Sequence, residues 1–162
     1  MVCGSGPGMA ISANKTKGIR AAVGYNTKST QLSRQHNNAN IIVFPELSLC
    51  GYPPQDLLLD EEFIQKNLEV LKKISQVSSI PIIVGYVRKE GKRIYNSAAI
   101  CYDGKLQSYY DKILLPTYDV FDEARYFKSG LKPTICKIPV SYTHLRAHET
   151  LRYRVCRLLL EK

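Results

Sequence analysis

A short apolar run that ends at a proline places the strongest constraint on how this chain can fold. Residues 41–44 read Ile-Ile-Val-Phe, which is typical of a buried β-strand, and Pro45 ends that strand because it lacks a backbone donor. Glu46 therefore follows directly on a buried strand end. A carboxylate there is partly desolvated, which raises its pKa and suits it to act as a general base. The alternative is an ordinary solvated loop carboxylate.

The segments that follow predict a mixed sheet. Asp60 is placed to cap a helix that ends before Ser78, and residues 81–87 return as a strand. Two more strands are expected at residues 94–102 and 106–112, with turns between them. Hairpin strands after a helix indicate a mixed sheet covered by helices. The apolar face of the helix is expected to consist of Phe63, Ile64, Leu68, Val70, Leu71, Ile74 and Val77.

The formal charge of +9 is concentrated at the two ends of the chain. Residues 1–34 carry five basic side chains and no acidic one, and residues 139–162 carry five basic and two acidic ones. The middle of the chain, residues 35–138, carries thirteen basic and twelve acidic side chains. A nearly neutral body argues against a phosphate-binding surface, so no nucleic-acid partner is expected.

Cysteine usage and hydropathy indicate a soluble protein of a reducing compartment. The five cysteines are odd in number and show no C-x-x-C spacing, so neither a zinc site nor a disulfide framework is expected. No apolar run approaches the length of a membrane span or a signal peptide. We therefore expect a cytoplasmic protein with no membrane partner and no bound metal.

The N-terminal segment, residues 1–22, shows no clear pattern. Its Gly-Ser-Gly-Pro-Gly run at residues 4–8 imitates a phosphate loop, but no strand precedes it. We expect residues 1–22 to be disordered or mis-framed. Residues 26–38 are polar and predict a short surface helix.

A second strand exit lies at Lys112. It is followed by a proline-containing loop dense in charged and aromatic residues. Neighbouring strand ends would place the Lys112 ammonium beside the Glu46 carboxylate, where a lysine can stabilise an oxyanion. A structural salt bridge is the alternative.

Several motifs together resemble the carbon–nitrogen hydrolase (nitrilase) superfamily. They are Val-Phe-Pro-Glu at residues 43–46, Tyr-Asp-Lys at 110–112 and Phe-Asp-Glu at 121–123. Two longer stretches, Gly-Tyr-Pro-Pro-Gln-Asp-Leu-Leu-Leu at 51–59 and residues 115–127, are similar to the glutaminase domain of glutamine-dependent NAD⁺ synthetases. The resemblance covers residues 23–138, and it implies an α/β fold, a truncated α-β-β-α sandwich of the nitrilase type.

The family's catalytic residues carry over onto matching positions. By resemblance, Glu46 is the general base, Lys112 the oxyanion-stabilising lysine and Glu123 the glutamate that supports that lysine. Tyr118 matches a tyrosine that binds glutamine.

The family also implies a reaction and its partners. L-Glutamine is hydrolysed through a cysteine thioester, and the ammonia passes to a synthetase domain of the same polypeptide. That domain uses ATP and Mg²⁺ to convert deamido-NAD⁺ to NAD⁺, whereas the glutaminase domain itself needs no cofactor. A homo-oligomer is expected for the full-length protein.

The nucleophilic cysteine of the family has no counterpart in this chain. The family places it in an Ile-Cys-Glu-Asp motif beyond the Phe-Asp-Glu loop, and no such motif occurs here. Cys136 follows Phe127 too soon and is succeeded by Lys-Ile, and Cys50 lies close to Glu46 in sequence. Buried free cysteines usually act as small apolar residues. As written, the chain is expected to be inactive.

Residues 139–162 explain this loss. Val140 to Thr150 reads as the translation of a sequencing-library transposase adapter, and Tyr153 to Lys162 as that of a flow-cell adapter with one substitution. We interpret residues 139–162 as a cloning or assembly scar. His144 and His148, spaced like a metal-binding pair, lie within this segment.

Two other functions remain as alternatives. The chain could derive from a stand-alone amidase of the same superfamily, although the Gly-Tyr-Pro-Pro-Gln-Asp run argues against it. The +9 charge motivates the second, a non-catalytic basic binding module.

Overall fold

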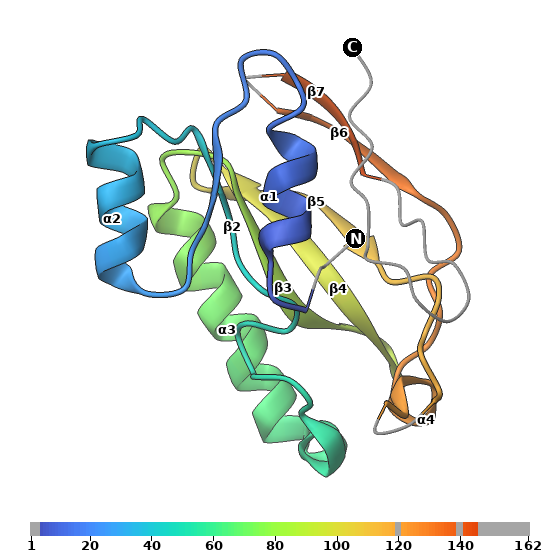
Figure 1. Ribbon diagram of the computed structural model, residues 1–162. Helices are drawn as coiled ribbons and strands as arrows, with labels where there is room; N and C mark the ends of the chain where they lie inside the picture. Colours follow the sequence, from blue (N-terminus) through green and yellow to red (C-terminus); the bar gives the residue numbers. More distant parts are fainter. Residues whose placement is uncertain (1–3, 119–120, 139–140, 146–162) are drawn as a thin grey trace.

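The computed structural model describes residues 4–118, 121–138 and 141–145 of the chain. A five-stranded sheet in the order β1-β2-β3-β4-β5 lies at its centre (Figure 1). The first three strands are parallel, and β3, β4 and β5 form an antiparallel meander. This confirms the mixed sheet that the sequence predicted. The strands are β1 (Ala21–Val23), β2 (Ile41–Val43), β3 (Ile82–Glu90), β4 (Arg93–Tyr102) and β5 (Lys105–Asp111).

Helices pack on both faces of this sheet. Ile41 and Val43 of β2 share a core with Met9, which lies in helix α1 (Pro7–Ala13). Ile42, between them, belongs to the core that contains Leu71 of helix α3 (Glu61–Val77). Because successive strand residues point to opposite faces, α1 and α3 cover opposite sides of the sheet. The third helix, α2 (Thr27–Gln35), contains no buried residue, which confirms the predicted surface helix.

The N-terminal segment is helical at Pro7–Ala13, where the sequence predicted a disordered or mis-framed segment, and the mis-framed start stays a prediction. Gly6 adopts φ 89°, and α1 begins at Pro7, where the missing N–H of proline is no loss. Met9 is only 1% exposed. The apolar side of a short helix thus finds a partner in the sheet, and this tertiary contact is invisible in the local sequence pattern. β1 follows and pairs with β2.

The bounds of α3 agree with the sequence prediction, but its buried face differs in part. The Asp60 carboxylate accepts a hydrogen bond from the Glu62 N–H at 2.8 Å and caps the helix. Val70 and Val77, expected on the apolar face, are 41% and 82% exposed. Each lies more than about 100° around the helix from Ile64, the centre of the buried face. Two polar residues, Asn67 and Ser75, are buried on that face instead.

Four small elements complete the described chain. A 3₁₀ helix, η1 (Gln55–Leu59), precedes α3, and a short helix, α4 (Glu123–Tyr126), follows β5. The strands β6 (Thr134–Ile138) and β7 (Ser141–Leu145) pair as a separate two-stranded sheet. The second sheet layer of the expected sandwich therefore stays a prediction.

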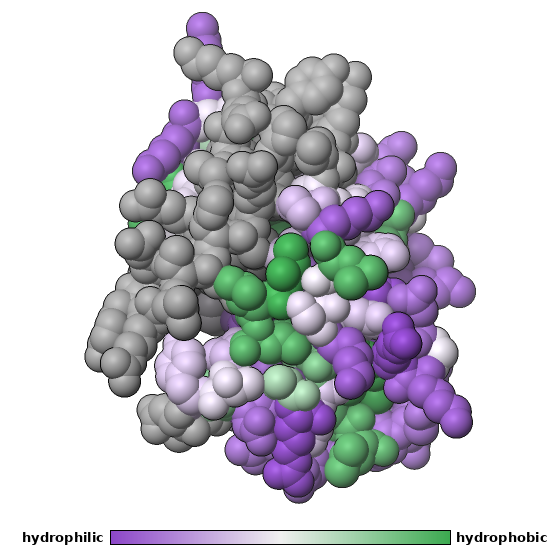
Figure 2. Space-filling model, turned by 90° about the vertical axis from the view of Figure 1, so that its right-hand side faces the viewer, coloured by the Kyte–Doolittle hydropathy of each residue, from purple (hydrophilic) through white to green (hydrophobic). Residues whose placement is uncertain are grey.

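Apolar residues reach the surface on one side of the molecule. Figure 2 shows an apolar area near the centre of this face, with hydrophilic residues to its right and below it. In the segment between β5 and β6, Leu114 is 48% and Leu131 is 99% exposed. Within the described residues, no helix is long and apolar enough to cross a membrane.

Candidate active site

Glu46 lies in a loop that leaves β2 and runs closely against β3. A Cβ atom at Gly85 would lie 2.3 Å from the Leu47 nitrogen and 2.6 Å from the Pro45 oxygen. Only glycine therefore allows the two backbones to approach this far. The contact directs Glu46 inward, where it is 6% exposed. The carboxylate at the strand exit is thus buried, as the sequence predicted.

Lys112 follows the last residue of β5, and its backbone is held from two sides. Its N–H donates to the Asn96 carbonyl at 2.8 Å, and its carbonyl accepts from the Gly130 N–H at 2.9 Å. A Cβ atom at Gly130 would lie 2.3 Å from the Asp111 oxygen, so this second contact also needs a glycine. The lysine side chain, with the residue 7% exposed, is fixed by its own strand end.

The ammonium of Lys112 lies between two carboxylates. Its Nζ donates to Glu46 Oε1 at 2.9 Å and to Glu123 Oε1 at 3.1 Å. Glu123 is the first residue of α4 and is 6% exposed. The two sequence stretches with the family motifs therefore meet in space and bring together three of the four predicted site residues.

Two uncharged donors complete the arrangement. The Asn96 amide donates from Nδ2 to Glu46 Oε1 at 2.6 Å and to Glu123 Oε2 at 3.3 Å. The Tyr52 hydroxyl donates to Glu123 Oε1 at 2.9 Å. We refer to Glu46, Asn96, Lys112 and Glu123 as the carboxylate cluster.

The electrostatics of the cluster favour a proton acceptor at Glu46. Burial raises the pKa of Glu46, and the nearby Glu123 charge adds to this, although Lys112 and the hydrogen bond from Asn96 act in the opposite direction. Burial lowers the pKa of Lys112, but attraction to both glutamates outweighs it, so the lysine pKa lies above its ordinary value. Lys112 therefore stays charged at neutral pH.

This arrangement suits acyl-transfer chemistry. A glutamate with a raised pKa can remove a proton from a nucleophile, and a fixed ammonium can stabilise the negative oxygen of a tetrahedral intermediate. The described residues contain no group of three or more His, Cys, Asp or Glu side chains that could hold a metal ion.

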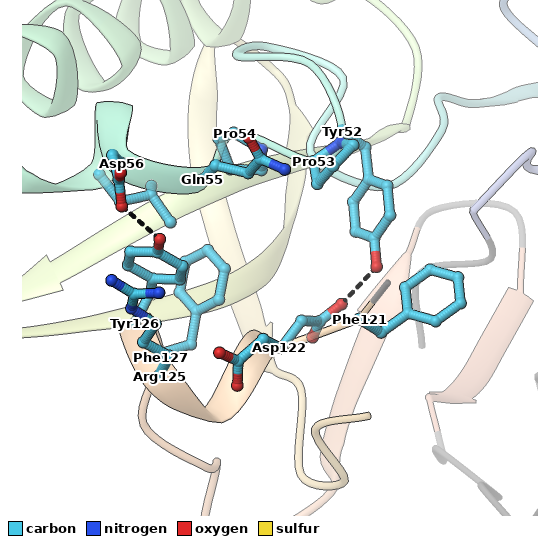
Figure 3. Close-up of a pocket in the computed structure, with 12 residues that line it drawn as sticks. Tyr52, Pro53, Pro54, Gln55, Asp56, Phe121, Asp122, Arg125, Tyr126 and Phe127 are labelled. Atoms are coloured by element: carbon cyan, nitrogen blue, oxygen red, sulfur yellow. Dashed lines mark hydrogen bonds between the residues drawn. The ribbon is translucent and has the colours of Figure 1, made fainter. Parts of the chain in front are cut away.

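Two hollows reach the cluster, one lined by Glu123 and the other by Glu46. A cavity of about 310 Å³ lies between the loop with Tyr52 to Asp56 and the segment from Phe121 to Phe127, and Glu123 lines it (Figure 3). Tyr126 joins the two walls through a hydrogen bond to Asp56. A groove of about 1040 Å³, lined by Glu46 and by residues of α2, lies beside the cluster. Tyr52 lines both hollows.

The fourth predicted site residue, Tyr118, lies outside the cluster. It is 58% exposed, and its ring makes an edge contact with Phe121 at 5.7 Å between centroids. Its assigned role in binding glutamine stays a prediction.

Cys50, one of the two cysteines considered as nucleophiles, shows no sign of an activated thiol. Burial raises the pKa of Cys50 to about 11, which disfavours the thiolate. Cys136 lies in β6, and its side chain is outside the described residues. His144 belongs to β7, whereas His148 and Cys156 also lie outside the described residues.

Sequence reasoning did not identify Asn96, Tyr52 or Gly85 as site residues. A signal for Asn96 was present, because Asn96, Ala98 and Ile100 alternate on one face of β4 and the other two are apolar. A polar residue at an inward position of a strand needs a polar partner. The role of Gly85 depends on a backbone contact between distant segments, which leaves no local pattern.

Comparison with known proteins gives two sets of similarities. The chain is 40% identical over 132 residues to a glutamine-dependent NAD(+) synthetase of Synechocystis sp., covering 76% of this chain and 22% of that protein. It superposes on the glutamine-dependent NAD⁺ synthetase of Acinetobacter baumannii with a TM-score of 0.64 and 28% identity, covering 88% of this chain and 26% of that one. An amidase from Nesterenkonia sp. shares the fold, with a TM-score of 0.58 and 21% identity over 72% of this chain and 44% of that one.

The second set concerns the N-terminal part. A family model described as Ribose/Galactose Isomerase matches residues 1–76. A probable ribose-5-phosphate isomerase B of Mycoplasma pneumoniae is 32% identical over 90 residues, which is 56% of each chain.

The first set shows that the chain is similar to part of the glutamine-dependent NAD⁺ synthetases. The chain spans about a fifth of the length of the synthetases that it matches. A mixed α/β fold with a five-stranded sheet agrees with these neighbours.

Proposed function

We propose that residues 23–138 are part of a glutaminase domain that hydrolyses the side-chain amide of L-glutamine. The ammonia would supply the ATP-dependent conversion of deamido-NAD⁺ to NAD⁺ by a synthetase domain of the same polypeptide. The observation that carries the proposal is the buried carboxylate cluster, which forms from both family-like stretches. Similarity to named glutamine-dependent NAD⁺ synthetases supports the same reaction class.

The cluster residues have defined roles in this proposal. Glu46 takes the proton of a cysteine thiol, and the thiolate attacks the amide carbon of glutamine. Lys112 stabilises the oxyanion, and Glu123 supports Lys112. The carbon–nitrogen bond breaks, ammonia leaves with the proton from Glu46, and water then hydrolyses the thioester to glutamate. Tyr118 contributes to binding of glutamine.

The chain as written lacks the nucleophile and is inactive. We place the missing cysteine in the part of the gene that the adapter-like residues 139–162 replace. ATP and Mg²⁺ belong to the synthetase domain. Cytoplasmic localisation and a homo-oligomeric full-length protein are part of the same proposal.

Completing the gene tests this function. The source DNA is read past the codon for Ile138, and the completed protein is assayed for release of glutamate and ammonia from glutamine. Hydrolysis is expected, with loss of roughly 10²-fold or more in Glu46→Gln. Glu62→Gln serves as the control, because Glu62 is exposed and its ion pair with Lys66 lies on the surface. A folded, completed protein without glutaminase activity would overturn the proposal.

A stand-alone amidase is the second candidate, and the shared fold with the Nesterenkonia amidase favours it. The completed gene distinguishes the two. An amidase would end soon after the hydrolase domain and would prefer short aliphatic amides to glutamine.

The isomerase-type match suggests a composite origin for the chain. The matched residues 1–76 include α1 and the glycine-rich segment before it, whereas the hydrolase-like motifs begin at Val43. We infer that an isomerase-like N-terminal segment is joined to a hydrolase-like body. Amplification across codons 20–60 from the source genome tests this inference. A single uninterrupted gene with this sequence would contradict it.

A further inference from the structure

Asn96 lies between the two carboxylates of the cluster and donates to both. It lies on β4 with no exposed surface, and its single amide nitrogen reaches Glu46 at 2.6 Å and Glu123 at 3.3 Å. The Asn96 amide and the Lys112 ammonium therefore each connect the two carboxylates.

The orientation of this amide is set by the acids. A turn of the amide by 180° would place its oxygen against two carboxylates, which is repulsive, so the nitrogen must face them. The Asn96 Oδ1 atom, correspondingly, has no hydrogen-bond partner in the described part of the chain. A buried oxygen without a donor is unfavourable, and buried polar groups are normally paired. The hydrogen bonds from Asn96 to the two carboxylates are therefore kept although its Oδ1 atom receives none.

A second buried asparagine, Asn67, is an example of a purely structural role. Asn67 of α3 donates to the Val87 carbonyl at 2.8 Å and accepts from the Val87 N–H at 3.4 Å. Both of its polar atoms are paired, and both partners belong to the backbone. Asn96 differs in each respect.

The hydrogen bonds leave Glu46 asymmetric. Oε1 accepts from both Asn96 and Lys112, whereas no hydrogen bond of the described residues reaches Oε2. A Cβ atom at Gly4 would lie 4.0 Å from Oε2, and both Gly4 and Glu46 line the groove. Oε2 is therefore beside the groove, where an incoming proton donor can reach it.

We propose that Asn96 is a positioning residue that occupies Oε1 of Glu46 and thereby makes Oε2 the oxygen that accepts the proton. The inference rests on the proposed function. In the proton transfer, the S–H bond of the nucleophile breaks, an O–H bond forms at Oε2, and the same proton later leaves with ammonia. Lys112, Glu123 and, through Glu123, Tyr52 are the other polar groups that face the cluster.

A titration of Glu46 in the full chain tests the role of Asn96. The protein is labelled with ¹³C at the glutamate carboxyl carbons, and the Glu46 signal is assigned by its loss in Glu46→Gln. In Asn96→Ala the Glu46 midpoint is expected to move to higher pH, because a donor to the charged form is lost. In Asn67→Ala, which removes an asparagine side chain at another buried site, the Glu46 midpoint is expected to be unchanged.

Each outcome decides the inference. An unchanged Glu46 midpoint in folded Asn96→Ala would overturn it. If that variant does not fold, Asn96→Ser, whose shorter side chain cannot reach both acids, takes its place under the same criterion. Loss of the fold in both, with Asn67→Ala folded, would assign Asn96 a purely structural role and also overturn the inference. Failure of the proposed function appears separately, as absent glutaminase activity with the titration shift intact.

Discussion

Arg88 binds Asp111 through two hydrogen bonds, of 2.8 and 2.7 Å, on the sheet face opposite to Lys112. The guanidinium also lies 4.2 Å from the centre of the Tyr95 ring and 4.6 Å from that of Tyr109. Asp111 is the residue before Lys112, so the pair anchors the strand end from which the lysine extends.

Replacement of Arg88 by lysine is expected to lower the free energy of unfolding by about 1–3 kcal/mol, because lysine cannot form the two-point contact or stack flat on tyrosine. Denaturant unfolding measures the change. Arg93→Lys is the control, because Arg93 is exposed and no ion pair involves it in the described residues. Equal stability of Arg88→Lys and the unmodified protein would show that Arg88 is not an anchor.

Replacement of Lys112 by methionine removes the only positive charge of the carboxylate cluster. Two buried carboxylates then face each other without a counter-ion, which we expect to destabilise the fold by about 3–5 kcal/mol at neutral pH. Part of this loss is expected to be restored at acidic pH, where the acids take up protons. Lys66→Met provides the control, because exposed pairs such as Lys66 with Glu62 contribute about 0–1 kcal/mol. The prediction fails if the two variants lose similar stability.

The raised pKa of Glu46 predicts a pH dependence of stability. Its folded pKa lies above the ordinary value near 4.5, so the folded state holds the proton to higher pH than the unfolded state. The contribution is fully present below the ordinary pKa and is lost as pH rises through the folded one. In Glu46→Gln this dependence is absent. We therefore expect the unfolding free energy of the unmodified protein, minus that of Glu46→Gln, to fall as the pH rises from 4 to 8. A difference that does not change with pH would contradict the raised pKa.

The close contact at Gly85 makes this residue sensitive to the smallest substitution. A methyl group in Gly85→Ala would meet the backbone of Pro45 and Leu47, and we expect a loss of at least about 1–3 kcal/mol from overpacking. Gly91→Ala is the matched control, because its Cβ meets no atom within 4 Å and only its φ of 57° is unfavourable. Thermal unfolding compares the two. A smaller shift for Gly85→Ala than for Gly91→Ala would show that the loop with Glu46 can yield.

Local patterns in the sequence predicted β2, α3 and the hairpin strands, because each has a strong apolar period or a clear capping residue. Resemblance to the family motifs predicted that Glu46, Lys112 and Glu123 belong to one site. Asn96 and Gly85 were missed because their roles depend on contacts between segments distant in sequence. The α1 helix was missed because its stability comes from packing on the sheet, and helix formation over seven residues is unfavourable in isolation.

The sheet topology sets an order of assembly for the carboxylate cluster. The β3-β4-β5 meander consists of sequence-local contacts, which form fast, whereas Glu46 must join Lys112 across 66 residues. We expect Asn96 and Lys112 to be in place on the meander before the loop with Glu46 docks against Gly85. A newly made chain would then place the Glu46 carboxylate after Asn96 and Lys112, so the ion pair between Glu46 and Lys112 becomes a marker that the loop after β2 has docked.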